Sequence, residues 1–289
     1  MGEPLPICFL NGDFMPLHEA RISPLDRGFL YSDGAYEVTP VYGGRPFRFT
    51  QHHDRLTRSL REIRMEDPLA REAWRDLYRE LIARNDHKGD LYIYVQVTRG
   101  AENGRNHAPL PDVPRTVFAF ASPWPEGRAG WRENGLPAVT AQDTRWARCD
   151  IKSVALLANI LLRQLAVDAG ASETILLRDG ELMEASASTV HVVRDGVLLT
   201  PHNSMRILPG TSRSVVEELA DELGIARRDA SISEAELRSA DEIWLAAATR
   251  EVQPVTRLDG KPVGSGTPGP LWRRIYDAWQ KLRADPTRF

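Results

Sequence analysis

The sequence predicts a mixed α/β protein folded in two domains, and three features support this class. Residues 91–98 alternate between apolar and polar side chains, which is the period of a half-buried strand. Leu56, Leu60 and Ile63 recur at spacings of four and three, as on one face of an amphipathic helix. Residues 122–135 are rich in proline and glycine and indicate a linker. We therefore expect a first domain over residues 1–121, a linker over 122–135 and a second domain over 136–289.

The first domain is expected to begin with two hairpins. Asn11 and Gly12 lie between two apolar runs and favour a tight turn, because both residues tolerate positive φ angles. A second turn is expected at Gly43 and Gly44, between a strand over residues 36–42 and a short return strand over 46–49. We expect helices around residues 56–63 and 74–81, and further strands over 91–98 and 116–121.

The second domain is expected to mix strands and helices along its length. Asp179-Gly180 and Asp195-Gly196 indicate tight turns between strands. We expect strands over residues 138–142, 174–177, 189–193 and 242–247, and helices over 153–167, 212–223 and 271–282.

Composition and charge exclude several classes of protein. The 37 Lys and Arg residues against 40 Asp and Glu give a net charge of −3 without a block of like charges, which argues against nucleic acid as the main partner. The longest apolar run, residues 154–162, is shorter than the roughly 20 residues that span a bilayer. Residues 1–10 lack the features of an export signal. Cys8 and Cys149 show neither disulfide nor zinc spacing, so we expect a soluble, cytoplasmic protein that acts on small molecules.

Lys152 is the first candidate for chemistry. The chain contains 33 arginines but only four lysines, and Lys152 alone among the lysines has apolar neighbours, at the expected start of the helix over 153–167. Desolvation there disfavours the ammonium form and favours the neutral amine that a Schiff base requires. The alternative is a lysine that reaches from a helix end into solvent.

A second candidate is the small-residue turn that opens the helix over 212–223. Leu208-Pro209-Gly210 runs into Thr211 and Ser212. Free backbone N–H groups, two hydroxyls and the positive end of the helix dipole are therefore available to a phosphate. The alternative is that Thr211 or Ser212 only caps the helix.

Glu184 is a third candidate. It lies on an expected strand that returns from a turn, and the small residues 185–188 follow it, which would let a ligand approach its carboxylate. The alternative is an exposed glutamate at a strand end.

Two motifs imitate known sites. The Gly-x-Gly-x-x-Gly pattern over residues 264–269 contains Pro268 and lacks the strand and acidic residue of a dinucleotide site, so we expect a loop. His52, His53 and Asp54 suggest a metal cluster, but adjacent side chains on a helix point about 100° apart. We expect a solvated helix start there and no metal site.

Seven motifs follow one another along nearly the whole chain. They are DRGF (26–29) with DGAYEV (33–38), HDRL (53–56), VTRG (97–100), RWARCDIKS (145–153), MEAS (183–186), LPG (208–210) and TREVQPV (249–255). Together they resemble the class IV, fold type IV, pyridoxal-phosphate-dependent aminotransferases, most closely the bacterial D-amino-acid aminotransferases. The resemblance implies a small N-terminal α/β lobe, a larger C-terminal pseudo-barrel lobe, and pyridoxal 5′-phosphate as cofactor.

The resemblance also assigns roles at the cofactor. It implies that Lys152 forms the Schiff base and moves a proton, that Glu184 faces the pyridine nitrogen, and that Leu208 packs against the ring. Arg55, Thr211 and Ser212 match the phosphate-binding residues, and the cofactor-binding set is completed by Ser188, Gly210 and Thr249. Two departures stand in this set: Ala248 lacks a hydroxyl expected at the phosphate, and Thr189 replaces a common Asn.

The substrate-binding positions follow from the same resemblance. Arg105 and His107 match a pair that reaches in from the neighbouring subunit and, with Tyr36, holds the substrate α-carboxylate in D-amino-acid aminotransferases. This implies a homodimer. The loop that carries the pair is one residue longer than the family pattern.

The predicted function is a two-step, ping-pong transamination that moves the amino group of a D-amino acid to a 2-oxo acid. The alternatives within the family are a branched-chain L-amino-acid aminotransferase, an R-selective amine transaminase and an aminodeoxychorismate lyase. A non-catalytic protein that binds pyridoxal phosphate is an alternative from another class, and Lys152 argues against it.

Overall fold

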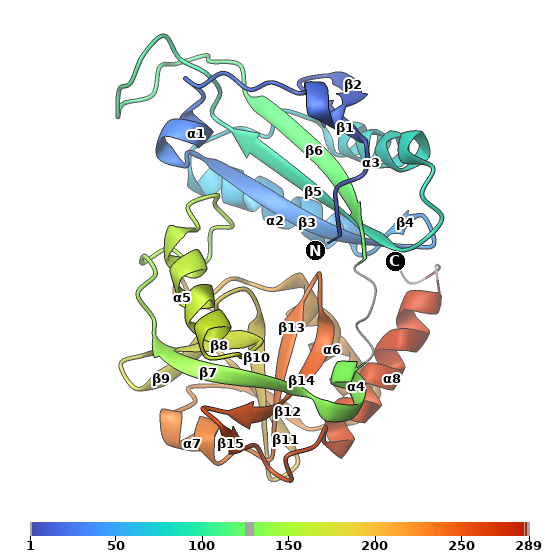
Figure 1. Ribbon diagram of the computed structural model, residues 1–289, viewed down its shortest axis with the longest axis vertical. Helices are drawn as coiled ribbons and strands as arrows, with labels where there is room; N and C mark the ends of the chain where they lie inside the picture. The colour runs from blue at the N-terminus through green and yellow to red at the C-terminus, as the bar shows by residue number, and fades with distance from the viewer. Residues whose placement is uncertain (1, 125–129, 286, 288–289) are drawn as a thin grey trace. The chain divides into compact units, whose positions relative to one another are not determined.

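The computed structural model describes residues 2–124, 130–285 and 287, which form two compact units (Figure 1). The first unit comprises the described residues up to 124 together with residues 151–155. The second unit comprises residues 130–150 and the described residues from 156 onward. Each unit has its own sheet and its own hydrophobic core.

The first unit is built on a six-stranded antiparallel sheet with the order β2-β1-β6-β5-β3-β4. Both predicted turns are present, but the return strand predicted over residues 46–49 is wrong in its bounds, because the strand is Arg45–Pro46 and α2 begins at Phe49. Asn11 and Gly12 have φ angles of 50° and 108° in the first turn, and Gly43 and Gly44 have 54° and 76° in the second. The strands are β1 (Ile7–Leu10), β2 (Asp13–Pro16), β3 (Gly34–Tyr42), β4 (Arg45–Pro46), β5 (Leu91–Thr98) and β6 (Thr116–Pro123).

Helices cover one face of this sheet. The short 3-10 helix Leu17–Glu19 and α1 (Arg27–Tyr31) precede β3, and α2 (Phe49–Glu62) and α3 (Arg71–Asn85) lie between β4 and β5. Figure 1 shows α2 and α3 on the same side of the strands. Their buried side chains meet those of the alternating strand β5, and this contact forms the core of the unit. Members of this core include Leu56, Leu60, Trp74, Leu81, Ile93, Val95 and Val97.

Residues 151–155 pair with the free edge at the start of β3. The Tyr36 N–H donates to the Lys152 carbonyl at 3.0 Å, the Val154 N–H donates to the Gly34 carbonyl at 3.1 Å, and Ser153 forms a bridge with Ala35. The prediction of a helix from residue 153 is therefore wrong at its start, since α5 begins at Leu157. Backbone groups that are paired with β3 cannot also make helical hydrogen bonds.

The second unit is built on a nine-stranded mixed sheet with the order β12-β11-β10-β13-β14-β7-β8-β9, with β15 paired to β14. Strand β9 also contacts β10 and β11, so the sheet curls back on itself. This confirms the expected pseudo-barrel. Its strands are β7 (Leu136–Gln142), β8 (Glu173–Arg178), β9 (Glu181–Ala185), β10 (Thr189–Arg194), β11 (Val197–Pro201), β12 (Arg227–Ala230), β13 (Glu242–Ala247), β14 (Glu251–Leu258) and β15 (Lys261–Pro262).

Five helices belong to the described residues of the second unit: α4 (Gly130–Asn134), α5 (Leu157–Asp168), α6 (Thr211–Glu222), α7 (Glu234–Arg238) and α8 (Pro270–Ala284). Helix α5 packs on β7 and β8, whereas α6 and α8 pack on each other and on β14. Residues 264–269 form a loop before α8, as predicted. Within the described residues, no helix combines the length and apolar character needed to cross a membrane.

The predicted linker over residues 122–135 is partly regular structure. Strand β6 extends to Pro123, and α4 begins at Gly130. Residues 125–129 lie outside the described part of the chain. Residues 151–155 come after the predicted linker but belong to the first unit, so a single boundary along the chain does not separate the two units. The limits of 1–121 and 136–289 remain a prediction.

His191 provides a test of how the second unit is stabilised. Its side chain is fully buried on β10, and its Nδ1 lies 2.7 Å from Thr200 Oγ1. Burial, and then the charge of Arg213, lower the pKa of His191 to about 3. The folded state therefore holds a neutral imidazole down to low pH, whereas the unfolded chain takes up a proton near pH 6.5.

We expect the free energy of unfolding to fall as the pH drops below about 6.5, by about 1.4 kcal/mol per pH unit from this group alone. Urea unfolding of the protein and of His191→Asn between pH 6.5 and 4.5 measures this contribution. The variant should lose less stability over that range, and identical slopes for both proteins would contradict the assignment.

Candidate active site

One group of candidate residues, around Lys152, lies in the first unit. The Lys152 Nζ lies 4.2 Å from the centre of the Tyr36 ring, a cation–π contact. The Lys152 N–H donates to Ser59 Oγ at 3.2 Å, and its carbonyl accepts from the Tyr36 N–H. Tyr36 stacks in turn on Tyr94, with 5.6 Å between ring centres. Lys152 therefore sits in an extended segment held on both sides of its backbone, and the alternative of a lysine at a helix end is wrong.

A buried charge cluster lies beside this segment, at the turn of α2 that faces β3. Both oxygens of Glu37 accept from Arg55: Nε to Oε2 is 2.9 Å and Nη2 to Oε1 is 2.6 Å. His52 Nδ1 lies 3.1 Å from Glu37 Oε1. Although burial opposes ionisation, Arg55 and His52 lower the pKa of the Glu37 carboxyl, and burial lowers the pKa of His52. The bidentate pair fixes the orientation of the Arg55 guanidinium.

The expectation of a solvated helix start at His52 and His53 is wrong. The two side chains are 2% and 9% exposed. His52 is buried because Glu37, on a strand 15 positions earlier, provides a partner for its ring. His53 packs its ring on Phe49, with 5.9 Å between ring centres.

The predicted substrate-binding pair lies on an exposed loop of the same unit. Arg27, which is buried, donates to the carbonyls of Asn106 and His107 at 2.6 and 3.1 Å and so anchors the loop. The Arg105 guanidinium lies 4.9 Å from the centre of the Tyr31 ring, and the His107 ring lies 5.5 Å from it. The structure thus brings Arg105 and His107 together on Tyr31, and not on Tyr36.

A second group of candidate residues, around Glu184, lies in the second unit. Glu184 on β9 is 6% exposed, and its Oε1 accepts from Arg145 Nη1 and from the Leu208 N–H, the latter at 3.2 Å. Arg145 is itself fixed by Asp143, with 2.9 Å from Nε to Oδ1 and 3.0 Å from Nη2 to Oδ2. The alternative of an exposed glutamate at a strand end is therefore wrong. The structure joins Glu184 and Leu208, two of the predicted cofactor residues.

The charges in this cluster are arranged around Arg145. Burial raises the pKa of the Glu184 carboxyl, with Arg145 acting in the opposite direction. Burial likewise opposes the ionisation of Asp143, but hydrogen bonds from Arg145 lower the pKa of that carboxyl. Arg145 therefore favours the ionised form of Asp143, and it donates its remaining hydrogen bonds to Glu184 and to the Arg206 carbonyl.

The start of α6 fits a phosphate group. Its N-cap residue is Gly210, which makes no side-chain cap, so the alternative of capping by Thr211 or Ser212 is wrong. Thr211 and Ser212 are instead the first two helical residues, and both are buried. A Cβ at position 210 would lie 2.6 Å from Thr189 Oγ1, so only glycine leaves this space open. Uncapped N–H groups at a helix N-terminus, two hydroxyls and a glycine are the features that bind phosphate.

The remaining predicted cofactor residues lie on turns of the second unit. Ser188 is buried, and its hydroxyl lies 3.2 Å from Glu173 Oε2. Ala248 and Thr249 lie in the turn between β13 and β14, and both are half-buried. Glu173 is fully buried and also accepts from the Thr174 N–H at 3.0 Å and from the Ser186 hydroxyl. Glu173 thereby holds the turn that follows Glu184.

Sequence reasoning missed the residues that support the predicted ones. Glu37 and Arg145 lie inside the recognised motifs but received no role, because their partners stand 18 and 39 positions away along the chain. The alternation over residues 91–98 gave a weak indication of Tyr94, because it places Tyr94 among the polar side chains of the strand. In the structure this side chain stacks on Tyr36. Glu173 had no signal in the sequence.

Comparison with known proteins identifies the class. Residues 34–258 match the family described as amino-transferase class IV. A D-alanine aminotransferase of Staphylococcus aureus is 37% identical over 274 residues, which cover 94% of this chain and 96% of that protein. A D-alanine aminotransferase of Listeria monocytogenes is 37% identical over 270 residues, with 92% of each chain covered.

Solved structures show the same relationship. A branched-chain amino acid aminotransferase of T.th., solved with pyridoxamine 5′-phosphate, superposes with a TM-score of 0.90 at 28% identity, covering 98% of this chain and 96% of that one. The branched-chain amino acid aminotransferase of Escherichia coli gives a TM-score of 0.91 at 27% identity, covering 96% and 94%. The chain belongs to the class IV aminotransferases. It is a pyridoxal-phosphate-dependent enzyme with the fold type IV architecture.

Proposed function

We propose that this enzyme transfers the amino group of a D-amino acid to a 2-oxo acid. The observation that carries the proposal is the similarity to D-alanine aminotransferases, which are 37% identical over nearly the full length of both chains. The branched-chain aminotransferases share the fold at lower identity, 27% and 28%. The Arg105 and His107 pair, which the family resemblance associates with D-amino-acid enzymes, supports the same choice.

Lys152 is the proposed catalytic residue. Bound pyridoxal phosphate supplies an electron sink that makes the Cα–H bond of an attached amino acid acidic. The Lys152 amine takes the proton from Cα and returns a proton on the other side of the transferred nitrogen. Hydrogen bonds of the Lys152 backbone N–H and carbonyl fix the position of its Cα. The Tyr36 ring limits where the side-chain amine can lie. A base held in this way acts at a high effective concentration.

Three further groups are proposed to hold the cofactor. Glu184, which Arg145 orients, would face the pyridine nitrogen of the bound cofactor and keep it protonated. Gly210, Thr211 and Ser212 bind the phosphate at the start of α6. Arg55, Ser188, Leu208 and Thr249 complete the set. Of these, Arg55 presents a guanidinium that the Glu37 carboxylate has already oriented.

A homodimer is proposed as the active form, with Arg105 and His107 of one chain serving the site of the other. The loop that carries this pair is exposed and is pinned by Arg27. Helix α5 presents an apolar face at the spacing of one side of a helix, with Leu157, Ile160, Leu161 and Leu165 exposed by 47–71%. A face of this kind is typical of a surface that a second protein covers. Two buried, unpaired cysteines support a cytoplasmic location.

Arg105→Ala tests the substrate-binding role. Loss of a charge-assisted contact to the substrate carboxylate should raise KM for the D-amino acid by about 10- to 100-fold. Cofactor retention should stay unchanged, because Arg105 has no proposed contact with the cofactor. Arg115→Ala, a loop arginine outside the predicted site, is the matched control. An unchanged KM for the D-amino acid would contradict the role.

The choice of substrate class is tested by steady-state assays with a 2-oxo acid acceptor. D-alanine, D-glutamate, L-leucine and a primary amine are supplied separately, and the oxo product is measured. The proposal requires D-amino acids to be used in clear preference to the other two. Equal turnover of L-leucine and D-alanine would favour the branched-chain alternative, and turnover of the amine alone would favour an amine transaminase.

A further inference from the structure

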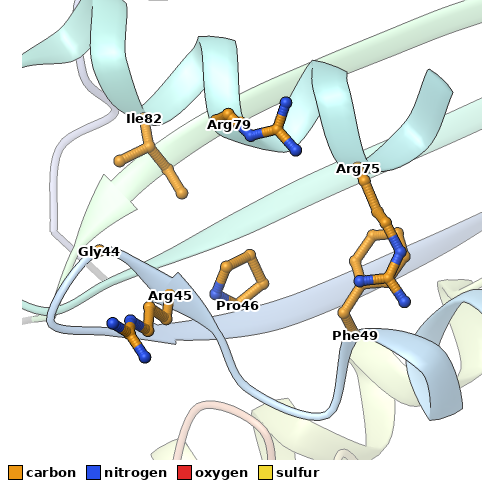
Figure 2. A pocket seen from close by; sticks show the side chains of 7 residues that line it. All are labelled: Gly44, Arg45, Pro46, Phe49, Arg75, Arg79 and Ile82. Atoms are coloured by element: carbon orange, nitrogen blue, oxygen red, sulfur yellow. The ribbon is translucent and has the colours of Figure 1, made fainter. Parts of the chain in front are cut away.

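A cavity of about 260 Å³ lies in the first unit, and none of the candidate active-site residues lines it. Helix α3 borders it on one side, and the chain that leads from the β3–β4 turn into α2 borders it on the other (Figure 2). Pro46, Phe49 and Ile82 provide apolar walls. The volume is close to the lower end, about 300 Å³, of small-molecule sites.

Three arginines line the same cavity: Arg45 from β4, and Arg75 and Arg79 from α3. No acidic side chain lies among the lining residues that the structure describes. Figure 2 shows the Arg75 side chain over the Phe49 ring. The Arg79 side chain runs along α3 toward Arg75. Clustered guanidinium groups next to apolar walls create a positive potential that attracts an anion.

Arg75 is the strongest indication of a ligand. Its guanidinium lies 4.6 Å from the centre of the Phe49 ring, and its Nη2 lies 3.3 Å from Thr50 Oγ1. Its Nε is buried and makes no hydrogen bond to any described residue. The same Nε lies 3.5 Å from Glu72 Oε1, in an ion pair whose Arg75 and Glu72 side chains are 41% and 80% exposed. An ion pair this long and this exposed contributes little to stability, so an anion in the cavity would give the Arg75 Nε a shorter hydrogen bond than it has now.

Arg79 can contribute without losing an essential partner. It pairs with Asp76 at 2.7 Å, and the side chains are 74% and 68% exposed. Such surface pairs contribute little to stability, so a bound anion can replace the pair.

We propose that this cavity binds a small anion carried on an apolar ring, such as an aromatic phosphate or carboxylate. Arg75 and Arg79 receive the anionic group, whose geometry matches the guanidinium fork. Pro46, Phe49 and Ile82 contact the ring, and Arg45 adds charge at the edge of the cavity. Because Phe49 is the first residue of α2, the ligand would contact the helix that carries Arg55.

Calorimetric titration of the holoenzyme tests the proposal with four probes: 1-naphthyl phosphate, 1-naphthoate, neutral 1-naphthol and inorganic phosphate. At least one naphthyl anion should bind about tenfold or more tightly than naphthol and inorganic phosphate, since only it offers both charge and ring. The comparison of the two naphthyl anions tells whether phosphate or carboxylate is preferred. The same titration is repeated with saturating D-alanine and should give the same affinity.

Arg75→Gln and Arg79→Gln should each weaken binding of the preferred anion by about tenfold or more. Arg84→Gln, on the same helix but outside the cavity, is the matched control and should bind as the wild type does. Arg79 is exposed, so its variant reports on the site even where Arg75→Gln impairs folding. Failure of both anions to bind, equal binding by naphthol, loss of binding with D-alanine, or unchanged affinity in Arg79→Gln would each overturn the proposal.

Discussion

Lys152→Ala is expected to abolish transamination, with kcat reduced by about a thousandfold or more. The amine that moves the proton at the substrate Cα is lost, and with it the cation over the Tyr36 ring. The fold should survive, because residues 151–155 are held to β3 by backbone hydrogen bonds that alanine preserves. Turnover of D-alanine, measured as pyruvate released in the presence of an acceptor, gives the result directly.

Lys281→Ala is the control for this change. Lys281 is an exposed lysine near the end of α8, and its removal should leave kcat unchanged. Equal thermal unfolding of wild type and Lys152→Ala would confirm that the loss is chemical. Substantial turnover by a folded Lys152→Ala protein would show that another group moves the proton.

Glu184→Gln is expected to lower kcat by about 10- to 100-fold. The amide keeps the shape and can still accept from the Leu208 N–H, but it carries no charge to hold a proton on the pyridine nitrogen. Arg145 retains two hydrogen bonds to Asp143, so its buried charge stays paired. The effect should therefore appear in kcat and not in stability.

Glu181→Gln provides the matched comparison, because Glu181 lies on the same strand β9. It should have wild-type kcat. Turnover of both variants and their cofactor content separate the possible outcomes. A Glu184→Gln enzyme with normal kcat, or one that loses its cofactor as readily as it loses activity, would contradict the role given to this carboxylate.

Local patterns predicted much of the fold. The Asn11-Gly12 turn, the alternation over residues 91–98 and the strand over residues 242–247 all depend on neighbours in sequence, and all are present. No local pattern predicted the curled sheet of the second unit, which was expected only from the family resemblance. The parallel pairing of β11 with β12 joins segments that no local pattern relates.

Site residues that stand in recognisable motifs could be predicted from the sequence. Contacts that depend on residues far away along the chain could not. The small-residue turn before Thr211 indicated a helix start, but it could not show that Gly210 leaves the N-terminus uncapped. The apolar run after Lys152 suggested an early helix, and pairing with the β3 edge overrides that preference. The burial of His52 depends on Glu37, which sequence spacing cannot reveal.

We expect the enzyme to take an amino group from a D-amino acid and to store it before a second substrate arrives. Release of pyruvate from D-alanine by the holoenzyme, without any acceptor, tests this most directly. We expect about one pyruvate per chain, and then no more until a 2-oxo acid is added, as ping-pong transfer requires. No pyruvate from D-alanine, or an equal and equally fast release from L-alanine, would contradict it.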